Sequence, residues 1–282
     1  MNYYTNIEKN WNINVNFTVK SYYGFYFWYN HHMASNFYDK VAQKFGNYQT
    51  GAQVTDEFPN GNPEAVFKEK LIEVSGRDKV ALDVGCADGR FTLSIANSFL
   101  KIKAIDTSNG MLESARKLQQ KQNVLNVEFV NQDIHTISFC KEFDVIYSRR
   151  GPIDYPLFYR ALKSNGKYVE IDIGEKDAME LKQIFGRGQN YGRWNKPELQ
   201  NDVEEITNAG FQVIFAEDYL YNEYYKTYQD LDLFLQGVPI FEDYDSNKDR
   251  KYLEEYVKRF KKDKGIILPR HRIVMAAKIS LS

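Results

Sequence analysis

From Lys79 onward the chain alternates between short apolar segments and amphipathic ones, and this rhythm constrains its fold more than any other feature. The apolar segments, expected to be strands, cover residues 80–84, 102–105, 127–130, 143–147 and 168–173. Helical patterns start near residues 91, 109 and 155. Strands and helices in alternation favour a parallel sheet with helices on both faces, joined by right-handed crossovers. The sequence therefore predicts a doubly wound α/β fold, whose ligands bind beyond the carboxyl ends of the strands.

The segments outside this core are less regular. Residues 1–60 are rich in Tyr, Phe and Asn, and we expect them to form a packed aromatic cap on a main domain that spans residues 61–282. Within that domain, strands are expected at 211–216 and 273–277, and a helical insertion at about 218–265. The chain has no low-complexity linker that would mark a clean domain boundary.

Composition narrows the setting and the partners. The 37 Lys and Arg residues nearly balance 38 Asp and Glu residues, whereas proteins that bind nucleic acid through bulk charge are usually basic. Cys86 and Cys140 cannot make a disulfide framework, which favours a reduced, cytoplasmic location. No apolar run approaches the roughly 20 residues of a membrane-spanning helix, and the N-terminus does not resemble a signal peptide. The sequence does not indicate an oligomeric state.

The strongest local motif runs from Leu82 to Phe91, where a buried strand ends in an acidic residue and a small-residue turn leads into a helix. Such turns bring the backbone and the positive end of a helix close to a ligand. A dinucleotide-binding fingerprint requires a third glycine or alanine at the position that Arg90 occupies. The motif therefore argues against a nicotinamide dinucleotide.

Polar residues also follow the next strands of the predicted sheet. Asp106 lies about 20 residues after the small-residue turn, where Rossmann-like sites place a ribose-binding acid, and Asp133 follows the third strand. Simpler roles stay open: Asp83 or Asp106 as a helix cap, and Asp133 as a turn residue. Cys86 is more typical of an inert turn residue than of a nucleophile, because no His or Lys in the motif would lower its pKa.

Taken together, these motifs resemble the class I S-adenosylmethionine-dependent methyltransferases, over roughly residues 35–175 and again near the final strand. The resemblance implies a seven-stranded sheet with a reversed edge strand. It implies that the small-residue turn lines the methionine part of S-adenosylmethionine, that Asp106 binds the ribose, and that the helix beginning near Phe37 covers the cofactor. The implied cofactor-binding residues are Tyr38, Asp83, Gly85, Cys86, Ala87, Gly89, Asp106, Thr107, Met111, Gln132, Asp133, Ile134 and Ser148.

One position departs from that family. Ala87 stands where the family usually has glycine, which is tolerated if the residue keeps a negative φ. Methyl transfer is an in-line displacement in which the cofactor supplies the reactivity and the protein supplies alignment. No general base is evident, and Glu170, Asp172 and Tyr155 are candidates.

The function predicted from these features is methyl transfer to a small-molecule acceptor, with Arg149, Arg150 and Tyr155 as candidate acceptor-binding residues. The two arginines would bind an anionic group. An RNA methyltransferase is an alternative and would rely on these arginines and the basic helix at 249–262, although the adenine-N6 and cytosine-C5 motifs are missing. A non-catalytic cofactor-binding protein is a third. No metal is expected, because the adjacent His31 and His32 cannot face the same way.

Overall fold

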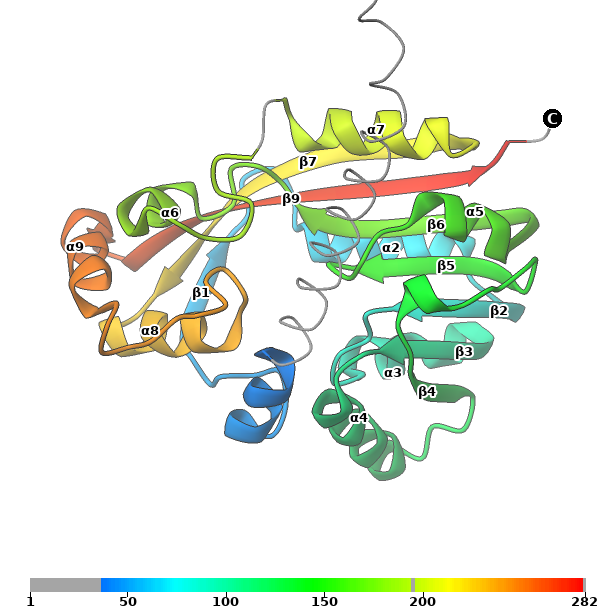
Figure 1. Ribbon diagram of the computed structural model, residues 1–282, viewed down its shortest axis with the longest axis horizontal. Coiled ribbons are helices and arrows are strands. Elements are labelled where there is room, and N and C mark those ends of the chain that lie inside the picture. The colour runs from blue at the N-terminus through cyan, green and yellow to red at the C-terminus, as the bar shows by residue number, and fades with distance from the viewer. Residues whose placement is uncertain (1–36, 194–195, 281–282) are drawn as a thin grey trace, which may run out of the picture.

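The residues that the structure describes form a single mixed sheet with helices on both faces (Figure 1). The computed structural model describes residues 37–193 and 196–280. The strands are β1 (Val54–Glu57), β2 (Gly76–Val84), β3 (Phe99–Asp106), β4 (Val127–Asn131), β5 (Phe143–Arg149), β6 (Leu162–Ile173), β7 (Phe211–Tyr225), β8 (Lys261–Lys262) and β9 (Gly265–Ile279). The α-helices are α2 (Pro63–Val74), α3 (Arg90–Ile95), α4 (Asn109–Gln122), α5 (Tyr155–Ala161), α6 (Met179–Phe185), α7 (Glu198–Asn208), α8 (Tyr228–Gly237) and α9 (Arg250–Phe260), after a further helix at residues 37–45.

The strand order is β1-β7-β9-β6-β5-β2-β3-β4, with β8 paired to β9. The chain moves outward from β2 through β3 to β4, then returns to the other side of β2 for β5 and β6. All of these neighbours are parallel, and β9 runs antiparallel to both β6 and β7. The order reverses between β2 and β5, which is where doubly wound sheets bind their ligands.

The predicted Rossmann-like α/β fold is confirmed, with two differences in the sheet. The described sheet has nine strands rather than seven, because β1 and β8 add to it. The reversed strand β9 is not the edge strand that we expected, since β7 pairs along its outer side and β1 pairs in turn with β7. In this way β1 joins the described part of the expected cap segment to the main sheet.

Two unusually long strands extend the sheet into a second lobe. β7 and β9 stay paired from Phe211–Ile279 to Tyr225–Ile266, and α6, α8 and α9 gather at the end of this ribbon remote from the C-terminus (Figure 1). The expected helical insertion at 218–265 is therefore wrong at its start, because residues 218–225 belong to β7. Tyr219 and Tyr221 of β7 are buried while Leu220 between them is exposed, which is the alternating burial of a strand.

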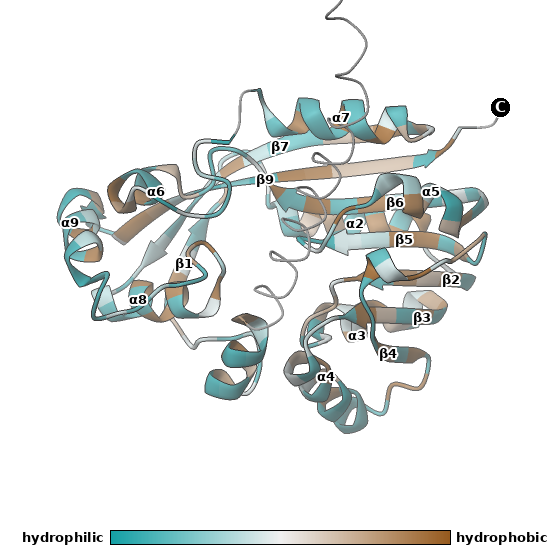
Figure 2. Ribbon diagram, in the orientation of Figure 1, coloured by the Kyte–Doolittle hydropathy of each residue, from teal (hydrophilic) through white to brown (hydrophobic). Residues whose placement is uncertain are grey.

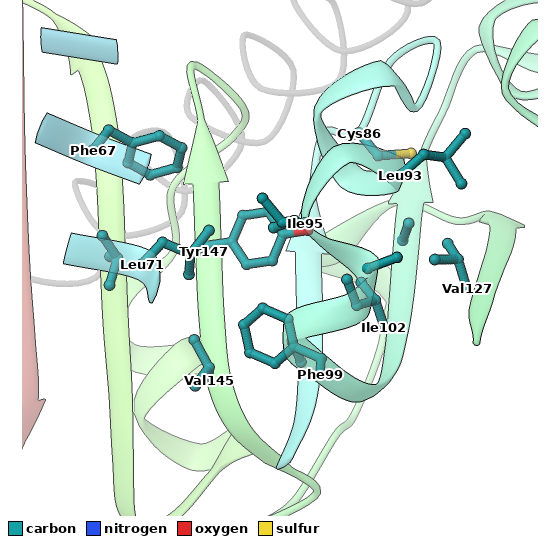
Figure 3. Packing of buried hydrophobic residues seen from close by; sticks show 14 of the residues in the cluster. Phe67, Leu71, Cys86, Leu93, Ile95, Phe99, Ile102, Val127, Val145 and Tyr147 are labelled. Carbon is teal, nitrogen blue, oxygen red and sulfur yellow. The ribbon is translucent and has the colours of Figure 1, made fainter. Parts of the chain in front are cut away.

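Each face of the central sheet has its own core. Figure 3 shows one face, where Phe67 and Leu71 of α2 lie near Tyr147 of β5 and the packing continues through α3 and α4. The opposite face packs against α5 and α7, and Phe158 and Tyr168 stack there with ring centroids 5.0 Å apart. Alternate residues of each strand serve the two faces, so apolar residues fill the central strands while the outer helices are largely hydrophilic (Figure 2).

Candidate active site

A cavity of about 1000 Å³ opens at the carboxyl ends of the central strands. One wall consists of the loops that follow β2, β3, β4 and β5, and the opposite wall consists of residues 187–190, Arg193 and residues 239–243. Twelve of the predicted site residues line this cavity: Tyr38, Asp83, Gly85, Cys86, Ala87, Asp106, Thr107, Gln132, Asp133, Ile134, Arg149 and Arg150.

The loop after β2 approaches the loop after β5 so closely that both need glycine. Gly85 has a φ of 78°, and a Cβ added there would lie 2.9 Å from the Cα of Gly151. A side chain on Gly151 would in turn meet the carbonyl oxygen of Val84 at 2.3 Å. Two backbones in such contact form a narrow floor at the switch point, with peptide groups rather than side chains facing a ligand.

The sequence analysis expects a negative φ at Ala87, but the φ of this residue is 46°. This left-handed conformation costs an ordinary residue roughly 1–2 kcal/mol relative to glycine. The backbone N–H of Ala87 donates a 2.8 Å hydrogen bond to Oδ2 of Asp106, which holds the loop in place. The loop conformation is therefore coupled to the residue predicted to bind the ribose.

Asp106 is not the cap of the helix that follows it. The N-cap of α4 is Ser108, whose side chain accepts from the N–H of Met111, while Oδ1 of Asp106 accepts from the N–H of Ser108 at 2.8 Å. Burial raises the pKa of Asp106, and these backbone hydrogen bonds oppose the shift. Each carboxylate oxygen can accept more than one hydrogen bond, so the side chain retains acceptor capacity toward the cavity.

Asp83 joins β2 to α3 beneath the loop, but not as a helix cap. Its Oδ2 accepts hydrogen bonds from the hydroxyls of Thr92 at 2.6 Å and Tyr147 at 2.9 Å, and the N-cap position of α3 belongs to Gly89. Burial raises the pKa of Asp83 to about 7, although both hydroxyl bonds favour the charged form. Asp83 therefore lies at the cavity floor with a pKa close to neutral pH.

The segment after β4 presents polar groups to the same cavity. Asp133 caps a short 3₁₀ helix, Ile134–Thr136, by accepting from the N–H of His135 at 2.9 Å, so its turn role is present in the structure. Beside it, Oε1 of Gln132 is buried and has no hydrogen-bond partner among the described residues. Buried polar atoms in native proteins are nearly always satisfied, so this acceptor suits a ligand that donates a hydrogen bond.

The helix at 37–45 is fixed over the cavity by polar contacts with α4. Oδ1 of Asp39 accepts hydrogen bonds from the hydroxyl of Ser108 at 2.5 Å and from the N–H of Gly110 at 3.0 Å. Tyr38, the residue before Asp39, lines the cavity, and its ring centroid lies 5.6 Å from that of Tyr48. Residues 37–60 of the expected aromatic cap are described, whereas residues 1–36 of that cap lie outside the described residues.

The chain also places residues at this wall that sequence reasoning missed. The backbone N–H of Tyr48 donates to Asp88 at 3.0 Å, and Nη2 of Arg90 donates to the carbonyl of Tyr48 at 3.1 Å. These two bonds tie the segment after the first helix to the β2–α3 turn. In the sequence, the only local signal of this contact is the charged pair Asp88 and Arg90 in the turn.

Four predicted site residues lie away from the cavity for identifiable reasons. Gly89 is a packing position, since a Cβ there would be 2.6 Å from the ring of Phe129. Met111 is fully buried against Val41 of the first helix, and the hydroxyl of Ser148 accepts from the N–H of Gly151 at 3.1 Å. Tyr155 lines a separate groove of about 470 Å³ on the other side of the sheet.

The three candidate general bases are not at the cavity either. Glu170 has no exposed surface and accepts hydrogen bonds from the hydroxyls of Tyr155 at 2.9 Å and Tyr168 at 2.6 Å. Asp172 does not line the cavity, and burial raises its pKa to about 6. None of these three side chains therefore reaches the cavity beside the loops that follow β2 to β5.

Arg149 and Arg150 reach the cavity but share one carboxylate. Nε of Arg149 lies 2.8 Å from Oε2 of Glu64 on α2, and Nη1 of Arg150 contacts Oε1 of the same residue. Burial alone would raise the pKa of Glu64, but the two guanidinium groups outweigh it and lower the pKa to about 2. Two cations against one anion leave a surplus positive charge at the rim.

The far wall is the cavity wall opposite the loops after β2 to β5, and it consists of two loops that are distant in sequence, at residues 187–193 and 239–243. The N–H of Gln189 donates to the carbonyl of Ile240 at 2.8 Å, and Nη2 of Arg187 bonds both carboxylate oxygens of Asp249 at 2.9 Å. Neither loop carries a motif that would have identified it as part of the site. Among the described residues, no cluster of His, Cys, Asp or Glu could hold a metal ion, and no helix is long and apolar enough to cross a membrane.

The cavity's residues fit S-adenosylmethionine. The glycine floor admits close backbone approach, Asp106 offers acceptors for hydroxyl groups, and the unpaired Oε1 of Gln132 suits a donor such as an amino group. Residues 81–166 match the family model of a methyltransferase domain. This range contains the cavity wall formed by the loops after β2, β3, β4 and β5, which we call the cofactor wall.

The chain is also similar to proteins of known sequence or structure. The chain is 26% identical over 203 residues to the biotin biosynthesis bifunctional protein BioHC of Cellvibrio japonicus, covering 68% of this chain and only 39% of that protein. A solved structure from Bacillus halodurans C-125, assigned as a methyltransferase, superposes with a TM-score of 0.57 at 17% identity, over 77% of this chain and 100% of the other.

The fold also serves other chemistry. The [4+2]-cyclase SpnF superposes with a TM-score of 0.55 at 15% identity, covering 88% of this chain and 96% of that one. At these identities the solved structures show a shared fold.

Proposed function

We propose that this chain, whose residues 81–166 match the family model of a methyltransferase domain, is a class I S-adenosylmethionine-dependent methyltransferase that transfers a methyl group from S-adenosylmethionine to a small-molecule acceptor. The observation that supports this most is the two-walled cavity of about 1000 Å³. Ligand pockets span about 300–1,000 Å³, and this cavity lies at the upper end of that range, which supports a site shared by a cofactor and a second small molecule. An acceptor enclosed against the second lobe would be limited in size.

In this proposal the residues of the cofactor wall have separate tasks. Asp106 accepts hydrogen bonds from the ribose hydroxyls, Gln132 and Asp133 face the adenine, and Gly85 brings peptide groups against the methionine portion. The bound cofactor supplies an electrophilic methyl group on a sulfonium. The protein's own contribution is alignment of the acceptor and exclusion of water, which together account for most of what an in-line transfer needs.

An RNA acceptor has less support from the described residues. The expected phosphate ligands Arg149 and Arg150 already pair with Glu64. On the basic helix, Arg250 and Arg259 pair with Glu254 and Glu255 one turn away. Such pairs are typical of a solvated helix face.

Calorimetry and a transfer assay test the proposal. We expect S-adenosylhomocysteine to bind much more tightly than NAD, and label from S-adenosyl[methyl-³H]methionine to enter the fraction of a cell extract below about 1 kDa rather than the RNA fraction. Tighter binding of NAD would refute the cofactor assignment. Labelled RNA would favour the RNA alternative, whereas tight cofactor binding without labelled product from any fraction would favour a protein that does not methylate.

A further inference from the structure

The guanidinium group of Arg187 is fixed in the far wall of the cavity. Its Nη2 bonds both oxygens of Asp249, which is itself held by the N–H of Asp245 at 3.0 Å. Its central carbon lies 5.0 Å from the ring centroid of Phe241 and 5.6 Å from that of Phe185, and the two rings stack 4.2 Å apart. An ion pair at one end and aromatic rings beside the plane leave this side chain little rotational freedom.

One nitrogen of this fixed group has no partner. Nη1 of Arg187 is buried and makes no hydrogen bond to the residues that the structure describes. Leaving a buried donor unpaired is costly, and nearly all such groups in native proteins are satisfied by protein, water or ligand. Because Arg187 lines the cavity opposite the cofactor loops, the free N–H groups identify a place for an oxygen atom of a ligand.

The charges around this wall indicate which kind of oxygen it would be. Arg187 is a fixed cation on this wall, and its buried partner Asp249 is bonded through Nη2 alone. Glu242 and Asp243 also line the wall, but burial raises the pKa of Glu242, and the side chain of Asp243, 3.5 Å from Arg187, is 73% exposed, so solvent screens its charge. Nη1 has no partner among the described residues, and charge-assisted hydrogen bonds to a carboxylate are the strongest that it could make.

We propose that Arg187 is the specificity-determining residue for the methyl acceptor, and that it binds a carboxylate group of that acceptor through Nη1. This inference rests on the proposed methyltransferase function. The Asp249 pair and the aromatic stack hold the guanidinium group of Arg187 in one orientation, which lowers the entropy cost of ordering it when a ligand binds. Arg149 and Arg150, the pair predicted from sequence to bind an anion, both contact Glu64 of α2.

Matched acids and amides test the inference on the full-length protein loaded with S-adenosylhomocysteine. Phenylacetate is compared with phenylacetamide, and hexanoate with hexanamide, by the concentration that half-maximally raises the melting temperature. We expect the wild type to favour at least one acid over its amide by about tenfold or more. If neither acid is preferred over its amide, the proposal is wrong.

Two variants of Arg187 and one control locate the effect. Arg187→Lys keeps a cation for Asp249 but lacks a second nitrogen, and Arg187→Gln removes the charge; both should abolish the preference for the acid. If Arg187→Gln does not fold, Arg187→Lys decides. Asp243→Asn should retain or increase the preference. A preference for the acid that survives in Arg187→Lys would overturn the assignment.

Failure of the proposed function gives a different result. Calorimetry with S-adenosylhomocysteine alone reports on the cofactor half of the cavity, and the acid–amide comparison can be repeated without it. Absent cofactor binding with an Arg187-dependent preference for the acid would refute the methyltransferase function while supporting the carboxylate site. Normal cofactor binding without a preference for the acid would refute the carboxylate site while supporting the cofactor assignment.

Discussion

The carboxylate of Asp106 accepts a 2.8 Å hydrogen bond from the backbone N–H of Ala87, 19 residues earlier in the chain. This bond joins the end of β3 to the turn after β2, and the turn residue that it holds has a positive φ. A side chain predicted to bind the cofactor thereby also maintains the loop that lines the cofactor cavity. Binding and loop stability should therefore respond together when it is removed.

Asp106→Ala should weaken S-adenosylhomocysteine binding by at least tenfold and also lower the melting temperature of the ligand-free protein. The affinity falls because hydrogen bonds to a charged group contribute about 1.5–3 kcal/mol each. The stability falls because the N–H groups of Ala87 and Ser108 lose their acceptor. Calorimetry and thermal melts on the same preparation measure both effects. Unchanged affinity in the folded variant would remove Asp106 from the cofactor site.

Ala87→Gly should leave the unfolding free energy unchanged or raise it by up to about 1 kcal/mol. Glycine relieves the cost of the positive φ, and its greater freedom in the unfolded chain offsets part of that gain. The matched control is Ala65→Gly in the first turn of α2, where the backbone is helical and the same substitution should be destabilising by up to about 1 kcal/mol. Urea denaturation compares the two, and equal destabilisation would mean that the turn is not strained at Ala87.

The cavity wall formed by the loops after β2, β3 and β4 could be predicted from sequence because its signals are local. The turn at Gly85 follows directly on a buried strand and precedes a helix, so its position in a parallel sheet placed it at the ligand edge. Asp106 and Gln132 follow neighbouring parallel strands in the same way, and regular strand–helix alternation brings all three together without knowledge of any long-range contact.

The far wall and the partners of the arginines depend on contacts that no local pattern contains. Arg149 meets Glu64 across 85 residues, and Arg187 meets Asp249 across 62. The expected helical insertion was wrong at its start for a related reason, since residues 218–225 pair as a strand with β9, more than 40 residues later in the chain.

Asp177→Asn should destabilise the protein by about 3–5 kcal/mol, the usual cost of removing one partner from a buried ion pair. Oδ1 of Asp177 accepts from Arg270 at 2.8 Å and from Arg272 at 2.5 Å, at the point where β9 passes from the central sheet into the second lobe. Burial alone would raise the pKa of Asp177, but the two arginines lower it below its ordinary value. Its contribution to stability is therefore present above pH about 4 and is lost as the pH falls further.

Urea denaturation at pH 7 measures this loss, and Asp243→Asn serves as the exposed control. That residue is 73% exposed and lies 3.5 Å from its arginine, so its removal should change stability by less than about 1 kcal/mol. Similar effects for the two variants would show that the junction between the lobes does not depend on the buried cluster.

Glu170→Gln should flatten the pH dependence of stability between about pH 5 and 8. Burial raises the pKa of Glu170 to about 8, although the hydroxyls of Tyr168 and Tyr155 favour its charged form. The folded protein then keeps a proton that the unfolded chain releases near the ordinary value for glutamate. The contribution of Glu170 is fully present below that ordinary value and is lost as the pH rises through 8, because each proton retained only in the folded state costs about 1.4 kcal/mol per pH unit.

Unfolding free energies at pH 5.5 and 7.5 test this assignment. The decrease between the two pH values should be smaller in Glu170→Gln than in the wild type by at least about 1 kcal/mol. Asp202, whose pKa burial raises to about 9 with help from Glu170, would retain its own share of the slope, so the variant should not become fully independent of pH. The control Glu69→Gln, on the exposed side of α2, should follow the wild type. If Glu170→Gln shows the wild-type slope, the carboxyl group between Tyr155 and Tyr168 is ionised in the folded protein at neutral pH, and its burial must be compensated by charge that the tyrosines do not supply.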